Sequence, residues 1–151
     1  MSQFTAPHPV IHRFLDHQST LARSDYLDAI TTGSFPEAVA LRPGRGRDRW
    51  FDSYLSRIVE RDAADISDAR RLADLPFVLR MIAARNAEEL NTTDIAKESG
   101  IPATSLTRLI HLLETLCLVR RIPAWGTNRS KRVIQRPKAM LLDTGLAARL
   151  V

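Results

Sequence analysis

Residues 91–119 constrain the fold of this chain more than any other segment, because their spacing suits two helices joined by a tight turn. Ala96 lies four residues before Gly100, where a small side chain lets a second helix approach closely. Gly100 tolerates the positive φ of such a turn, and Pro102 suits a helix start, where its missing N–H is not needed. The inward positions of the second helix recur at three and four residues and are Leu106, Leu109, Ile110, Leu113 and Leu116. The spacing predicts a helix-turn-helix, with an ordinary helical hairpin as the alternative.

The residues that follow predict a small β-hairpin. Residues 118–122 suit a short strand, residues 125–130 a turn and residues 132–134 a returning strand. A further strand is expected over 138–143, and a short helix over 144–151 with Asp143 or Thr144 as its cap. A hairpin directly after the second helix makes the expected unit a winged helix.

The chain before residue 91 predicts helices. Gly33 is expected to end a helix over 25–32, and Ser34 can cap a second helix that has Pro36 in its first turn. A longer helix is expected over 47–66, since its apolar residues form one stripe: Trp50, Phe51, Tyr54, Leu55, Ile58 and Val59. The predicted fold is therefore mainly α, with a helical N-terminal segment followed by a winged helix-turn-helix that carries a small β-hairpin.

The positive charge of the chain is concentrated in one stretch. The 151 residues hold 22 basic and 17 acidic side chains, for a net charge of +5. Residues 118–138 contain seven of the basic residues and no acidic ones, which leaves 15 basic against 17 acidic residues elsewhere. An anionic partner is therefore expected at this edge of the molecule, with a solvated basic edge as the alternative.

A winged helix bound to DNA places its second helix in the major groove and its wing on phosphates. The outward residues of the second helix that can contact DNA are Thr104, Ser105, Thr107 and Arg108. The wing residues that can neutralise phosphates are Arg129, Lys131 and Arg132. The outward face has few long polar side chains, which argues against sequence-specific reading, and a winged helix that only docks on protein is the alternative.

Other chemistry is weakly indicated. The single cysteine, Cys117, lies among leucines, which predicts a buried, inert thiol and a cytoplasmic protein without disulfides. Trp125 in the wing can stack on a base or on a partner, but closing over the small sheet is the preferred interpretation. No spacing indicates a metal or cofactor site, and no apolar run approaches the length of a membrane span.

Several motifs occur in an order that resembles a known family. They are Gly33–Glu37, Arg49–Leu55 with Arg61-Asp62, the helix-turn-helix, Leu118–Pro123 and Asp143–Leu146. Over about residues 20–151 the chain resembles the C-terminal region of bacterial and archaeal AAA-type ATPases called domain of unknown function 4143. The resemblance implies a nucleotide-binding domain before this region and a nuclease-like fold after it.

The chain departs from that plan, because it has no G-x-x-x-x-G-K-[ST] loop to cradle phosphates and magnesium. We therefore expect no enzyme activity from it. The expected parts are a remnant linker of short helices (1–45), a helical segment (46–90), the winged helix-turn-helix (91–143) and the start of a truncated continuation (144–151). The leading hypothesis is a non-catalytic module that binds DNA. The alternatives are a protein-interaction module that docks on an ATPase domain in trans and an inactive remnant of a truncated or split gene.

Overall fold

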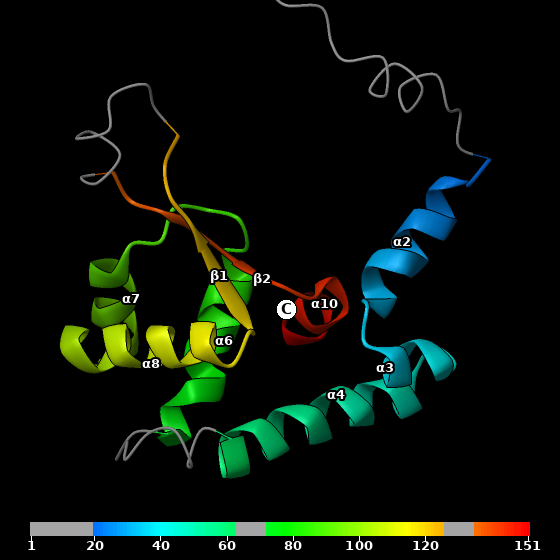
Figure 1. The fold of residues 1–151 in the computed structure, drawn as a ribbon, viewed down its shortest axis with the longest axis horizontal. Helices are drawn as coiled ribbons and strands as arrows, with labels where there is room; N and C mark the ends of the chain where they lie inside the picture. The colour runs from blue at the N-terminus through cyan, green and yellow to red at the C-terminus, as the bar shows by residue number, and fades with distance from the viewer. Residues whose placement is uncertain (1–19, 63–71, 126–134) are drawn as a thin grey trace, which may run out of the picture.

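The computed structural model describes residues 20–62, 72–125 and 135–151. These residues form helices and one two-stranded antiparallel sheet, which confirms the mainly helical class (Figure 1). The elements are α2 (Arg23–Thr32), α3 (Pro36–Ala40), α4 (Arg45–Arg57), the π turn η1 (Ile58–Asp62), the 3-10 turn η2 (Leu72–Asp74), α6 (Leu75–Ala84), α7 (Thr92–Ser99), α8 (Ala103–Thr115), β1 (Val119–Ile122), β2 (Lys138–Leu141) and α10 (Thr144–Leu150). Among these residues, no helix is both long and apolar enough to cross a membrane.

Helices α7 and α8 meet at the predicted turn. Asn91 caps α7, its side-chain oxygen accepting hydrogen bonds from the backbone N–H groups of Thr93 and Asp94. Gly100 ends α7 in the left-handed conformation, with φ at 69°. Helix α8 begins at Ala103, because Pro102 lies just outside it as the capping residue. The helix-turn-helix spacing thus has the local geometry that its glycine and proline require.

The inward stripe of α8 is the centre of the core. Leu106, Leu109, Ile110 and Leu113 are each 2% exposed or less, as the periodicity predicts. They lie in one cluster with the buried side of α6 and with β1 and β2. The expected stripe missed Leu112, which is buried, whereas Leu116 is only partly buried. Because the core lies on this one side, the opposite side of α8 faces solvent.

The sheet pairs β1 with β2 in the register Val119↔Leu141 to Ile122↔Lys138. The strand expected at 118–122 is therefore present, but its observed partner is the segment expected as a further strand. The returning strand expected at 132–134 lies outside the described residues. The other edge of β2 is covered by residues 86–90, where backbone hydrogen bonds join Ala87 and Glu88 to Ala139.

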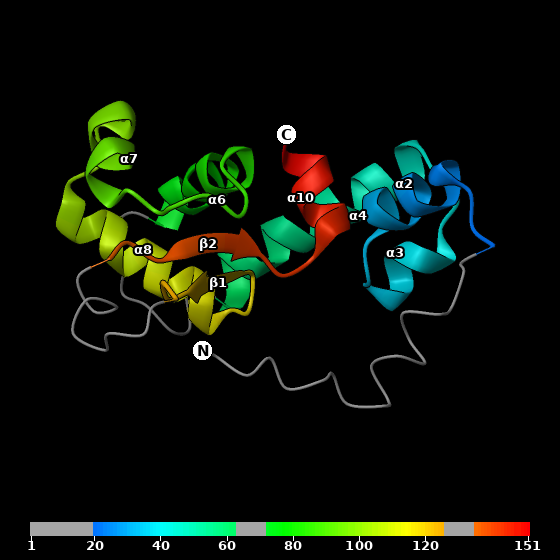
Figure 2. The same cartoon turned by 90° about the horizontal axis from the view of Figure 1, so that it is seen from above.

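The N-terminal helices extend the molecule away from this core. Helix α4 and the π turn that follows it carry the predicted stripe, with Phe51 and Ile58 buried. They cover the expected helix as far as Asp62, and residues 63–66 of the range expected over 47–66 lie outside the described residues. Trp50 and Tyr54 stack on each other and pack against Phe35. Figures 1 and 2 both show α10 between the sheet and the α2–α3 pair, in contact with α2 and α6.

Candidate functional site

The predicted DNA-contacting residues of α8 lie on its solvent face. Thr104, Thr107 and Arg108 are exposed, and Ser105 is half-buried. The hydroxyl of Thr107 donates to the backbone oxygen of Ala103 at 2.8 Å, one turn earlier, and must leave this bond to donate to a phosphate oxygen. The structure therefore brings the four predicted residues of this helix together on the first two turns of α8.

The end of α8 is tied to β1 by an ion pair. Arg121 donates to a carboxylate oxygen of Glu114 at 2.5 Å, and its backbone N–H donates to the other oxygen at 3.2 Å. The hydrogen bond from this guanidinium lowers the pKa of Glu114 below its ordinary value of 4.5. Glu114 is the single acidic residue between 102 and 125 in the sequence. Because Arg121 neutralises it, the remaining charges of this segment are positive.

Two sequence-based interpretations of the α8–β1 region are wrong. Cys117 is exposed, because the turn after α8 gives it a positive φ of 54°, which directs the side chain away from the leucines beside it in sequence. Trp125 does not close over the sheet, since it is 85% exposed. The predicted wing residues Arg129, Lys131 and Arg132 lie outside the described residues.

A buried polar junction joins two motifs that are far apart in sequence. Asp143 is 5% exposed and accepts hydrogen bonds from the backbone N–H and the hydroxyl of Ser34, at 2.6 and 2.9 Å. Its other oxygen accepts from the N–H of Leu146 at 2.7 Å, which caps α10 as expected. Ser34 was expected to cap α3, but Phe35 occupies the capping position. The serine instead anchors α10 to the α2–α3 turn.

Glycines allow the two segments of this junction to approach. A Cβ on Gly145 would lie 2.6 Å from the backbone oxygen of Thr32, and a Cβ on Gly33 would lie 2.5 Å from a carboxylate oxygen of Asp143. Arg47 is buried nearby and donates to Ala38 O, Thr32 Oγ1 and Leu41 O. Sequence reasoning missed Arg47, because it lies in a run of alternating arginines typical of a surface. These residues position helices, so the junction is structural.

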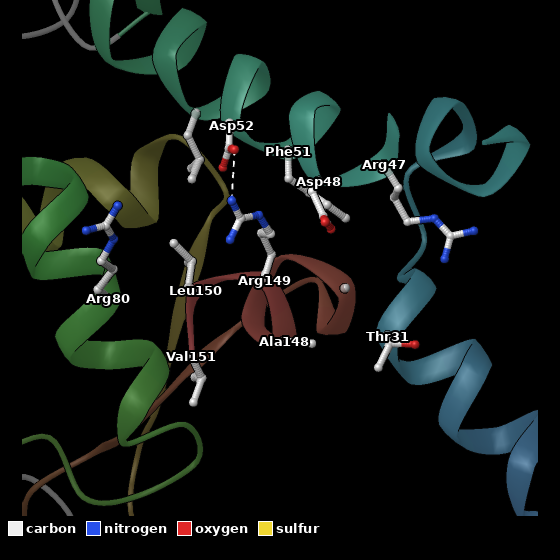
Figure 3. Close-up of a pocket in the computed structure, with 12 residues that line it drawn as sticks. Thr31, Arg47, Asp48, Phe51, Asp52, Arg80, Ala148, Arg149, Leu150 and Val151 are labelled. Carbon is white, nitrogen blue, oxygen red and sulfur yellow. Dashed lines mark hydrogen bonds and ion pairs between the residues drawn. The ribbon is translucent and has the colours of Figure 1, made fainter. Parts of the chain in front are cut away.

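A cleft of about 570 Å³ lies between α4 and α10. Arg149 of α10 donates to Asp52 of α4 at 2.8 Å across it, and Figure 3 shows the Arg47 guanidinium directed away from this pair. Asp48 and Arg80 add one charge of each sign to the lining. Among the described residues no group of three or more His, Cys, Asp or Glu side chains can hold a metal ion.

Comparisons with known proteins give a family but no function. A family model described as a domain of unknown function (DUF8612) matches residues 23–151. Uncharacterized proteins of Mycobacterium bovis and Mycobacterium tuberculosis are each 26% identical over 119 residues. The matched segment covers 79% of this chain but 27% of each relative. No solved structure matches the chain. The resemblance to AAA-type ATPases stays a prediction.

Proposed function

The chain belongs to the DUF8612 family, whose function is unknown, and we propose that it is a non-catalytic module that binds DNA through α8 and the basic stretch after it. The observation that carries this proposal is the composition of the solvent face of α8, where Thr104, Thr107 and Arg108 are exposed together. Hydroxyl and guanidinium groups on the first turns of such a helix are the groups that contact phosphates and base edges.

Charge supports the same partner. The sequence between 102 and 125 has one acidic residue, Glu114, and Arg121 pairs with it. Arg108, Arg120 and Lys138 are exposed, and none of these three side chains forms a hydrogen bond or ion pair with the other residues that the structure describes. The expected wing cations Arg129, Lys131 and Arg132 lie on the same stretch of sequence. Backbone phosphates are the anions that such a spread of single cations suits best.

The test is fluorescence anisotropy of the whole chain with labelled duplex DNA at about 50 mM salt. If about four cations contact phosphates, log affinity falls against log salt with a slope near −3.6, from about −0.9 per contact. Replacing Arg129, Lys131 and Arg132 by alanine should reduce the magnitude of that slope by about 2.7, because three of the four phosphate contacts are lost. The matched control replaces Arg23, Arg42 and Arg45, which are exposed in or beside α2, α3 and α4, so that the net charge falls by the same amount.

Saturable binding that the wing variant weakens and the control leaves unchanged supports the proposal. Equal losses in both variants would mean that binding follows net charge alone and would contradict a defined interface. Arg108→Ala should also weaken binding, because a guanidinium aimed at a base edge contributes about 1–3 kcal/mol.

A second candidate function is docking on an ATPase domain supplied by another chain. The observation that favours it is α2, none of whose residues is buried. Leu27 and Ile30 are 51% and 50% exposed at helical spacing, together with Tyr26 at 46%. A contiguous apolar face of this kind is typical of a protein-binding surface. The test is co-purification with a P-loop ATPase encoded by a neighbouring gene. Co-purification that nuclease treatment does not affect, and that replacing Leu27 and Ile30 with aspartate abolishes, would support docking over DNA binding.

A further inference from the structure

A further pocket, of about 370 Å³, lies between α3 and one face of α4. Small-molecule sites in proteins have volumes of about 300–1,000 Å³, so this pocket is at the lower end of that range. Three of the motifs named from the sequence, which the proposed function does not use, meet at it. They contribute Phe35 and Glu37 from the first motif, Trp50 and Tyr54 from the second, and Arg61 from the third.

Helical period gathers four of the pocket's side chains on one face. Steps of four, three and four residues lead from Trp50 through Tyr54 and Arg57 to Arg61, and residues at such steps lie on one side of a helix. The π turn η1 continues this face beyond the end of α4, so that Arg61 lines the same pocket as Trp50. The face is therefore aromatic at one end and cationic at the other.

Aromatic rings form the apolar wall of the pocket. The ring centroids of Phe35 lie 5.3 Å from those of Trp50 and 4.7 Å from those of Tyr54. These three side chains pack on one another but are only partly buried, whereas Phe51 beside them is 1% exposed. The ring surface that the cluster leaves uncovered lines the pocket, where a planar apolar group can lie against it.

Charged side chains of both signs surround the rest of the pocket. Glu37, Arg57 and Arg61 are exposed, and none of them forms a hydrogen bond or ion pair with the other residues that the structure describes. Guanidinium groups bind phosphate through charge-assisted hydrogen bonds, and an anion between two of them relieves their mutual repulsion. The carboxylate of Glu37 can accept hydrogen bonds from hydroxyl or amino groups.

A ligand that suits all parts of this pocket carries a planar ring, an anionic group and hydroxyl or amino donors. We infer that the pocket binds a nucleoside monophosphate. Its base lies against Phe35 and Trp50, and its phosphate lies between Arg57 and Arg61. Glu37 accepts from the ribose hydroxyls or from an amino group of the base. This site is additional to the DNA-binding face of α8 and does not depend on it.

The test is isothermal titration calorimetry of the full chain with the four common 5′-ribonucleoside monophosphates. At least one of them should bind saturably. The nucleotide that binds most tightly is then compared with its nucleoside and with inorganic phosphate. Each of these should bind at least about tenfold more weakly, because each makes only part of the charge-assisted and apolar contacts.

Arg57→Ala and Arg61→Ala should each weaken nucleotide binding by about tenfold or more and leave nucleoside binding within about twofold, because each removes a hydrogen bond to a charged group. Glu37→Gln should weaken binding of the nucleotide and of the nucleoside but leave binding of inorganic phosphate unchanged. The matched control is Arg49→Ala, which removes an exposed arginine of α4 that does not line the pocket. All four positions are exposed, so circular dichroism should show unchanged folding.

Fluorescence reports on the aromatic end of the pocket. The sequence holds two tryptophans, so in Trp125→Phe the emission comes from Trp50 alone. Nucleotide binding should change this emission, and adding Arg61→Ala should move the change to about tenfold higher nucleotide concentration.

Two results would overturn the inference. One is the absence of saturable binding by all four nucleotides. The other is a loss of nucleotide affinity in Arg57→Ala and Arg61→Ala that is no larger than in Arg49→Ala, or that the nucleoside shares equally, because the phosphate would then not lie on these arginines. Neither result would affect DNA binding by α8, which the anisotropy assay measures separately.

Discussion

Removing the carboxylate of Asp143 should loosen α10 from the α2–α3 turn. This carboxylate is 5% exposed and accepts hydrogen bonds from the backbone N–H of Ser34, from the hydroxyl of Ser34 and from the N–H of Leu146. In Asp143→Ala the serine hydroxyl can rotate toward water, but the two backbone N–H groups are fixed by the chain. The N–H of Leu146 is the more costly of the two, because Leu146 is 1% exposed whereas Ser34 reaches solvent.

The size of the effect follows from those two groups. A buried donor left without an acceptor costs about 1–3 kcal/mol, and a partly solvated one lies at the low end of that range. Together they predict a loss of about 3 kcal/mol in the free energy of unfolding. For a chain of this length, 1 kcal/mol shifts the Tm by about 2–4 °C, so the Tm should fall by about 6–12 °C. Ser34→Ala should cost about 1 kcal/mol, because it removes only the hydroxyl.

Urea unfolding followed by circular dichroism at 222 nm measures both variants and the double variant. The stability loss of Asp143→Asn should lie between those of Ser34→Ala and Asp143→Ala. Asparagine also caps helices, but it presents an amide donor toward the N–H of Ser34. A loss for Asp143→Ala below 1 kcal/mol, or one no larger than that of Ser34→Ala, would refute the reasoning that these N–H groups depend on the carboxylate.

Two further predictions concern packing and pH. Gly145→Ala should destabilise the chain by about 1–3 kcal/mol in the same urea assay, because the added Cβ would lie 2.6 Å from Thr32 O. The control is Gly46→Ala in α4, where the added Cβ would have no atom within 4 Å, so this change should be neutral or stabilising. Glu114→Gln should reduce stability at neutral pH but not in acid: the lowered pKa of Glu114 makes its contribution complete above the unfolded value of 4.5 and lost as pH falls through the lower folded value. If the unfolding free energies of Glu114→Gln and of the unmodified chain differ by the same amount at pH 7 and at pH 3, the second prediction is contradicted.

The helical parts of the fold were predictable because their signals are local. A positive φ at Gly100 and an inward stripe in α8 depend on residues within a few positions of one another, where backbone sterics and helical period act. The solvent face of α8, with Thr104, Thr107 and Arg108, follows from the same period. Most of the candidate DNA-contacting surface on this helix could therefore be located without a structure.

The region around the sheet was harder, because sequence neighbours do not determine what a turn residue faces. Cys117 follows a run of leucines but occupies a positive-φ turn that directs it to solvent. Trp125 is apolar enough to cover a two-stranded sheet, yet it remains 85% exposed at the end of β1. The partner of β1 was expected at 132–134, while the observed pairing is with Lys138–Leu141.

The sequence by itself determined a mainly helical chain, the helix-turn-helix spacing and the concentration of positive charge after α8. Only the tertiary structure decided that Ser34 and Asp143, 109 residues apart, hold α10 in place, and that Arg47 is buried against carbonyl groups while Trp125 is 85% exposed. The physical reason is the range of the interactions along the sequence. Helical period and turn sterics act between near neighbours, whereas burial depends on which distant segments pack together, and a local sequence pattern does not determine that packing.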